Sequence, residues 1–313
     1  MRISGFSFVR NADRLFYPVR ESILSVLPLV DEFVIAIGDC APGDGTVALI
    51  ESIGSTKIKI IHTVWDTATY PKATIYAQQT NVAKEACTGD WLLYIQGDEV
   101  LHERDYAAIR SACEKYVHND RVEGLLFAYR HFWADYNHIN RSHSAYGHEI
   151  RMIKNLPDIY SYGDAQGFRR IPGFDKQNFR QKEGVFKLHV AKVDAHVYHY
   201  GWVRPPDFMM RKKQFSNTLH HGQEKTEANF SAQLFDYGPV GRKPAYKDTH
   251  PAVMQERIAA FDWGHMLNYA KHQKKYNRPP LKHEKWHIRL LSFFEIYIFK
   301  RQLFTAHKYI LVK

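Results

Sequence analysis

Carboxylate side chains stand at two places where a short apolar run ends. Asp39 follows the run Glu32 to Gly38, and Asp98 and Glu99 follow the run Trp91 to Ile95. In an open parallel sheet the carboxyl ends of the strands share one edge, and ligands bind in the crevice beyond it. Carboxylate oxygens there can accept hydrogen bonds or hold Mg²⁺ or Mn²⁺. The sequence therefore predicts a polar ligand site where these two runs end.

Strand and helix patterns alternate through the first third of the chain and would position those carboxylates. The apolar and β-branched runs predict strands at 2–9, 32–38, 57–63 and 91–95. The segments between them predict helices at 14–27, 46–53 and 73–86. This rhythm is typical of an α/β fold with a parallel sheet and helices on its faces.

The rest of the chain has a different pattern. Strands are predicted at 124–132, 149–154 and 197–203, irregular structure at 157–195, and helices at 207–220, 251–274 and about 286–304. We divide the chain into residues 1–120, which carry the strand-end carboxylates, residues 121–220, and a basic helical extension of residues 221–313.

Two stretches resemble the nucleotide-binding half of family-2 glycosyltransferases of the GT-A fold. They are VDEFVIAIGDCAPGDGT and QQTNVAKEACTGDWLLYIQGDEVLHE, and the order and spacing of their motifs agree over residues 3 to 103. Three later segments, EIRMIKN, SYGDAQGFR and HVYHYGWVRPP, resemble the acceptor half of bacterial members. The resemblance implies a GT-A (Rossmann-like) domain, in which a mainly parallel sheet is flanked by helices, with an acceptor-side region and a C-terminal helical extension.

The resemblance also implies an activity and a set of binding residues. The enzyme would transfer a sugar from a UDP- or GDP-linked donor to a glycan or lipid-linked acceptor, with inversion, in the synthesis of cell-envelope glycans. Asp39 would form a hydrogen bond with the base or ribose of the donor, or else cap its own loop. Arg204 and Lys213 would neutralise the diphosphate. The residues implied to contact the donor are Val9, Arg10, Asn11, Asp39, Gln79, Gln96, Gly97, Asp98, Arg204 and Lys213.

A divalent cation, Mn²⁺ or Mg²⁺, is implied at Asp98, which matches the last Asp of an Asp-x-Asp motif. His199 is the second implied ligand, because a neutral imidazole suits Mn²⁺; a strand histidine bonded to the backbone is the alternative. This chain departs from the family at the first acidic position, which is Gln96. Gln96 is a poor metal ligand, so Asp98 is the sole acidic ligand that this motif offers a cation.

An inverting transfer needs a general base to deprotonate the acceptor hydroxyl. Asp164 is the first candidate, because its glycine-flanked loop between the two halves could reach a bound sugar. Glu149 is the second, and an ion pair with Arg151 on the same strand face is its alternative.

All of the net charge of +10 lies in the C-terminal segment. The residues from Arg242 to Lys313 include 15 Lys or Arg and 5 Asp or Glu, interleaved with aromatic residues between Trp286 and Phe304. This pattern favours either an anionic membrane surface or a helix packed on its own domain with a solvated basic face. Nucleic acid is not expected as a partner, because no recognised binding motif accompanies the charge.

The three cysteines, Cys40, Cys87 and Cys113, form no CxxC pair, and we expect reduced thiols in a cytoplasmic protein. The protein would be peripheral on the inner face of the cell membrane if the basic segment binds there. Two other functions stay open. A nucleotidyltransferase that makes nucleotide sugars would need a Gly-rich loop after the first strand, where this chain has Val9 to Asp13. The second of these functions is that of a non-catalytic membrane-associated scaffold.

Overall fold

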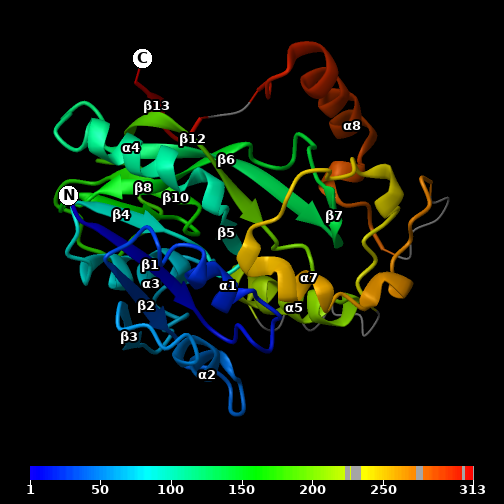
Figure 1. Cartoon of the computed structure of the whole chain (residues 1–313), viewed down its shortest axis with the longest axis horizontal. Helices are drawn as coiled ribbons and strands as arrows, with labels where there is room; N and C mark the ends of the chain where they lie inside the picture. Colours follow the sequence, from blue (N-terminus) through cyan, green and yellow to red (C-terminus); the bar gives the residue numbers. More distant parts are fainter. Residues whose placement is uncertain (223–225, 227–233, 273–277, 305–306, 313) are drawn as a thin grey trace.

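One mixed sheet runs through the computed structural model, which describes residues 1–222, 226, 234–272, 278–304 and 307–312 (Figure 1). Within the described residues the order of strands along the sheet is β13-β12-β6-β8-β4-β1-β2-β3. The strands from the first third of the chain, which pair in parallel, are β1 (Ile3–Val9), β2 (Glu32–Ile37), β3 (Ile58–His62) and β4 (Trp91–Tyr94). The predicted α/β architecture with helices beside the sheet is confirmed.

The later strands extend this same sheet. β8 is antiparallel to both of its neighbours, β4 and β6, while β6, β12 and β13 run parallel to one another. These strands are β5 (Glu99–Leu101), β6 (Gly124–Trp133), β7 (Asp135–Ile139), β8 (His148–Lys154), β12 (His189–His199) and β13 (Ile310–Leu311). A separate sheet holds β9 (Ile159–Tyr162), β10 (Gly167–Arg170) and β11 (Phe186–Lys187).

Two predictions for this region are wrong. Residues 157–195 are not irregular, because β9, β10, β11 and the first part of β12 lie there. The strand predicted at 197–203 instead runs from His189 to His199, since its pairing with β6 sets its length.

Helices cover both faces of the sheet. The helices of the described part of the chain are α1 (Val19–Leu24), α2 (Thr46–Glu51), α3 (Ile75–Glu85), α4 (Tyr106–Tyr116), α5 (Pro206–His221), α7 (Gln255–Ala259) and α8 (Trp286–Phe293), of which α8 contacts the loop at His143. Short 3₁₀ turns span Glu103–Asp105, Val240–Arg242, Ala252–Met254, Trp263–Met266 and Lys282–Glu284. α1 is shorter than predicted, because Asn11 and Phe16 have positive φ angles that turn the chain before Pro18.

The core lies on both sides of the parallel strands. Along β2, Phe33, Ile35 and Ile37 belong to one buried cluster, while Val34 and Ala36 belong to the other. Successive side chains of a strand point to opposite faces, so a strand that is covered on both faces is apolar throughout. This packing fixes the strand ends that carry Asp39 and Asp98.

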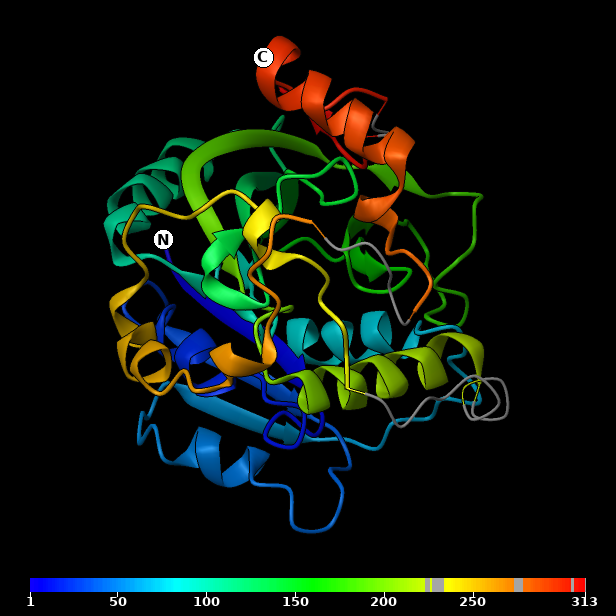
Figure 2. The ribbon, with the colours of Figure 1, turned by 90° about the vertical axis from the view of Figure 1, so that its right-hand side faces the viewer.

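The C-terminal segment differs most from its prediction. The helix predicted at 251–274 is replaced by the short α7 and two 3₁₀ turns, and residues 273 and 274 lie outside the described part. The helix predicted at 286–304 is α8 followed by a π-helical turn, Phe294–Phe299, and it ends at Lys300 in the left-handed conformation. Figure 2 shows α8 at the end of the molecule away from α2. Among the described residues, no helix combines the length and apolarity needed to cross a membrane.

Candidate functional site

A cavity of about 320 Å³ opens beyond the carboxyl ends of β1 and β4, against α5. Its walls come from the segment after β1, the turn after β4, the loop between β9 and β10, the end of β12 and one face of α5. Seven residues predicted from the sequence line it: Val9, Arg10, Gln96, Gly97, Asp98, Asp164 and His199. The fold therefore brings together side chains that lie up to 190 positions apart in the chain.

Asp98 is the buried carboxylate of this cavity. Its backbone carbonyl accepts a hydrogen bond from Tyr200 N–H at 2.8 Å, which ties the turn to the end of β12. Its Oδ2 accepts a hydrogen bond from Lys212 Nζ at 3.1 Å and lies 3.8 Å from His199 Nε2. Burial alone would raise the pKa of Asp98, but the neighbouring cations, Lys212 foremost, hold that pKa well below its usual range. Asp98 is therefore ionised at neutral pH.

A pair of buried histidines fixes the tautomer of His199. His131 Nε2 lies 2.8 Å from the Tyr146 carbonyl, so this nitrogen must donate. Burial lowers the pKa of His131 to about 3, so its ring is neutral and its Nδ1 accepts. His199 Nδ1, which is 3.0 Å away, must then carry the hydrogen. Burial also lowers the pKa of His199 to about 4, so its Nε2 keeps a free lone pair on the side of Asp98.

The donor atoms of Asp98 and His199 are of types that suit a divalent cation. A neutral imidazole nitrogen and a carboxylate oxygen both suit Mn²⁺. Two ligands about 2.1 Å from one ion are typically 3 to 4 Å apart, and the Asp98–His199 distance is 3.8 Å. Within the described residues there is no group of three or more His, Cys, Asp or Glu that could hold a metal ion. Lys212 bonds the same oxygen of Asp98, so a cation there would compete with this ammonium.

Two cations lie beside Asp98. Arg204 is completely buried, donates to the Leu15 carbonyl at 2.6 Å and stacks on the ring of Tyr17. Its Nε and Nη2 atoms are buried without a hydrogen-bond partner among the described residues. Burial lowers the pKa of Lys212 to about 8. Lys212 lines the cavity and would bond an anion there, while Arg204 would act on that anion only through its charge.

The structure places Lys212 in the cavity, instead of the predicted Lys213. α5 turns Lys212, Phe215 and Ser216 into the cavity, which is the i, i+3, i+4 spacing of one helix face. Lys213 is exposed on another side of α5, with its ammonium over the ring of Phe235.

Besides Lys213, four predicted donor contacts lie outside the walls of the cavity: Asn11, Asp39, Gln79 and the buried Arg204. Asp39 accepts a hydrogen bond from Arg10 Nη2 at 2.7 Å and one from the backbone N–H of Trp65 at 2.9 Å. Because Arg10 and Trp65 line the cavity, Asp39 orients its rim. The Asn11 side chain instead accepts a loop hydrogen bond from Ala41 N–H. Gln79 is buried and bonded to Thr63, so it holds α3 against the strand end rather than facing a ligand.

The two candidate bases are in different places. Asp164 lines the cavity and accepts a hydrogen bond from Gln166 Nε2 at 3.1 Å. Glu149 is buried at a separate hollow, 3.7 Å from Lys308 Nζ, and burial raises its pKa. The alternative pairing of Glu149 with Arg151 is not formed, since Arg151 binds Glu99 instead.

Among the side chains of the site that sequence reasoning missed are Tyr17, His131 and Lys212. Lys212 has a local signal, because it shares a helix face with other cavity residues. His131 has none, because only the pairing of β12 with β6 places His131 opposite His199.

No protein-family model matches the sequence, and no curated protein matches it at the significance required. Among solved structures, S. aureus TarS in complex with UDP-GlcNAc is 14% identical, with a TM-score of 0.39 over 72% of this chain and 70% of that chain. Against another TarS structure this chain spans only 42% of the length of that protein.

Two further structures match over 41% of this chain. Glucosyl-3-phosphoglycerate synthase from Mycobacterium tuberculosis, in complex with Mn²⁺, UDP and phosphoglyceric acid, is 14% identical, with a TM-score of 0.29 over 43% of its length. Mannosyltransferase PcManGT from Pyrobaculum calidifontis, in complex with GDP-Man and Mn²⁺, is 14% identical, with a TM-score of 0.32 over 36% of its length.

Proposed function

We propose that the protein is an inverting glycosyltransferase that takes a sugar from a UDP- or GDP-linked donor. The observation that carries this proposal is the cavity beyond β1 and β4, where the ionised Asp98 is bonded by the half-buried Lys212 and feels the charge of the buried Arg204. A polar crevice at this edge of a parallel sheet is where α/β proteins bind nucleotides. Residues 1–120 would bind the nucleotide and residues 121–220 the acceptor.

Each group has a role in this proposal. Val9, Arg10 and Gln96 border the nucleotide, with Asp39 holding Arg10 in place. Lys212 binds the diphosphate, and the charge of the buried Arg204 helps to stabilise it as the sugar leaves. A divalent cation held by Asp98 and His199 would supply further neutralisation of the leaving group.

Asp164 is the proposed general base. It lies on the cavity wall near Trp202, whose indole offers a flat surface on which an acceptor sugar can stack. A base must come within hydrogen-bond reach of the hydroxyl that it deprotonates, and the position of Asp164 on the cavity wall supports this role for an acceptor bound there. Glu149 does not line this cavity, which leaves it the weaker candidate.

The acceptor and its location complete the proposal. The basic segment 221–313 would meet an anionic membrane at the inner face of the cell, where a lipid-linked acceptor for an envelope glycan would be available.

Calorimetric titration of UDP and GDP, with Mn²⁺ and with EDTA, tests the donor site. Lys212→Gln should weaken binding by about 1.5–3 kcal/mol, because it removes a charge-assisted hydrogen bond to the diphosphate. Lys213→Gln is the matched control, since it removes the same charge from the next position of α5 and should change binding little. Equal losses in both variants, or no binding by either nucleotide, would contradict the proposal.

A further inference from the structure

Helix α8 and the π-helical turn after it contact the rest of the protein through polar side chains. Ser292 Oγ accepts a hydrogen bond from His143 N–H at 2.8 Å, and Glu295 Oε1 lies 2.8 Å from His143 Nδ1. Ser292 and Glu295 are the buried side chains of this segment. Helices of globular proteins usually pack their apolar stripe against the core. In α8 the arrangement is reversed.

Seven large apolar side chains of this segment face solvent instead, while Ile288, Leu291 and Ile296 are partly buried. Their exposed fractions extend from 38% at Phe294 to 75% at Trp286. The others in this range are Leu290, Phe293, Tyr297, Ile298 and Phe299. Single exposed apolar residues are ordinary, but a contiguous group marks an interaction surface. We call these seven side chains the apolar face of α8.

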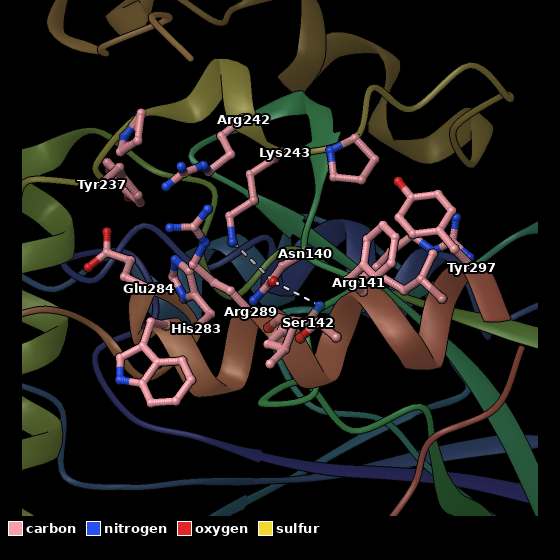
Figure 3. Close-up of a pocket in the computed structure, with 17 residues that line it drawn as sticks. Asn140, Arg141, Ser142, Tyr237, Arg242, Lys243, His283, Glu284, Arg289 and Tyr297 are labelled. Carbon is pink, nitrogen blue, oxygen red and sulfur yellow. Dashed lines mark hydrogen bonds between the residues drawn. The ribbon is translucent and has the colours of Figure 1, made fainter. Parts of the chain in front are cut away.

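A cationic cavity of about 670 Å³ lies beside this helix, between α8 and the loop around residues 237–244. Figure 3 shows the side chains of Arg242, Lys243 and Arg289 turned toward one another in this space. The nearby carboxylate of Glu284 is engaged by Arg278 at 2.7 and 2.8 Å. In the parts of the chain that the structure describes, no carboxylate is at ion-pair distance from any of the three.

Among the three cations of this cavity, Lys243 has a pKa that burial shifts. Its Nζ donates to Asn140 Oδ1 at 3.1 Å and lies over the ring of Trp133. Burial lowers the pKa of Lys243 to about 7; the carboxylate of Glu284 acts against this shift, and the charge of Arg242 acts with it. Clustered like charges are unfavourable without a counter-ion. An anion in the cavity would relieve this repulsion and keep Lys243 charged.

We propose that this cavity binds the phosphate of an anionic phospholipid while the apolar face of α8 lies in the membrane interface. Such a lipid satisfies both features at once, since its phosphate matches the cations and its acyl chains match the aromatic residues. A second copy of this chain fits less well, because the whole net charge of +10 lies in residues 242–313, which include the cavity cations, and two such surfaces repel. The inference deepens the membrane part of the proposed function and rests on it.

Sedimentation with vesicles of phosphatidylcholine, with and without phosphatidylglycerol, tests this inference. The double variant Arg242→Gln/Arg289→Gln removes two cations of the cavity. The control Lys247→Gln/Lys285→Gln removes two exposed cations of the same segment that do not line it. We expect the cavity variant to lose about tenfold more affinity for phosphatidylglycerol vesicles than the control does, because only the cavity cations would bond the phosphate directly. Phe293→Ser/Tyr297→Ser should abolish the binding that persists in high salt.

Several outcomes would overturn the inference. Equal losses in the cavity and control variants would mean diffuse attraction without a phosphate site. Equal binding to neutral vesicles would remove the role of the anionic lipid. Light scattering that shows a dimer, lost in Phe293→Ser/Tyr297→Ser, would assign the apolar face to a second copy. Unchanged melting temperatures would show that the variants fold. The vesicle assay contains no nucleotide sugar, so its failure would leave the proposed transferase reaction standing. Failure of the nucleotide titration would likewise leave the result of the vesicle assay standing.

Discussion

Replacing Glu99 by Gln should destabilise the fold, whereas replacing the adjacent Asp98 by Asn should mainly weaken ligand binding. Glu99 is fully buried and accepts hydrogen bonds from Arg151 Nε at 2.8 Å, from Arg151 Nη2 at 2.7 Å and from the Tyr129 hydroxyl at 2.7 Å. It also accepts from the backbone N–H of Gln96 at 3.1 Å. These bonds join the turn after β4 to β6 and β8, so Glu99 holds the turn on which Asp98 is displayed.

The loss of stability expected for Glu99→Gln follows from the burial of Glu99 and Arg151. The side chains of Glu99 and Arg151 are 0% and 1% exposed, so Glu99→Gln leaves a buried guanidinium without a counter-charge. Breaking a buried ion pair in this way costs about 3–5 kcal/mol. At about 2 °C per kcal/mol for a chain of this size, the melting temperature should fall by about 6–10 °C. Asp98→Asn should cost no more than about 1–2 kcal/mol, because Asn still accepts a hydrogen bond and Lys212 can reach water.

Thermal melting followed by circular dichroism, together with nucleotide titration, checks this contrast. The double variant Glu99→Leu/Arg151→Met should melt closer to the wild type than Glu99→Gln does, since it removes both buried charges. A Glu99→Gln variant that melts like the wild type, beside an Asp98→Asn variant that melts 6 °C or more lower, would refute the structural role assigned to Glu99.

Nitrogen-15 NMR should show His199 as the Nδ1–H tautomer, and His131→Phe should abolish this preference and weaken Mn²⁺ binding by about 10–100-fold; a mixture of tautomers in the wild type would contradict the assigned hydrogen-bond chain. Asp164→Asn should lower turnover by about 10²–10⁴-fold with nucleotide affinity retained, while Glu149→Gln should not, and the reverse pattern would move the base to Glu149. Burial raises the pKa of Glu32, but hydrogen bonds, that of the Lys59 ammonium foremost, outweigh it and lower the pKa from 4.5 to about 2. The carboxylate therefore stabilises the fold above pH 4.5 and loses this effect as the pH falls toward 2, so urea unfolding should show a larger deficit for Glu32→Gln at neutral pH than in acid.

The sequence alone determined the parallel half of the fold and the strand ends that carry chemistry. The run Glu32 to Gly38 is apolar because β2 is covered on both faces, and that pattern is readable without knowing what covers it. The polar residue that ends such a run is equally local, which is why Asp98 was identified and lies in the cavity. Local periodicity and strand ends are properties of a short window of residues, so they can be recognised without knowledge of the rest of the chain.

Only the tertiary structure decided which side chains meet. His131 faces His199 because β12 pairs with β6 in one register, and Lys212 faces Asp98 because packing sets the rotation of α5. The same limit applies to α8, whose amphipathic sequence predicts a helix but does not say which face the protein covers. Register and rotation are set by contacts between segments distant in sequence, and a shift of one residue turns a different side chain toward the ligand. That is the physical reason why Lys213 was predicted and Lys212 lies in the cavity.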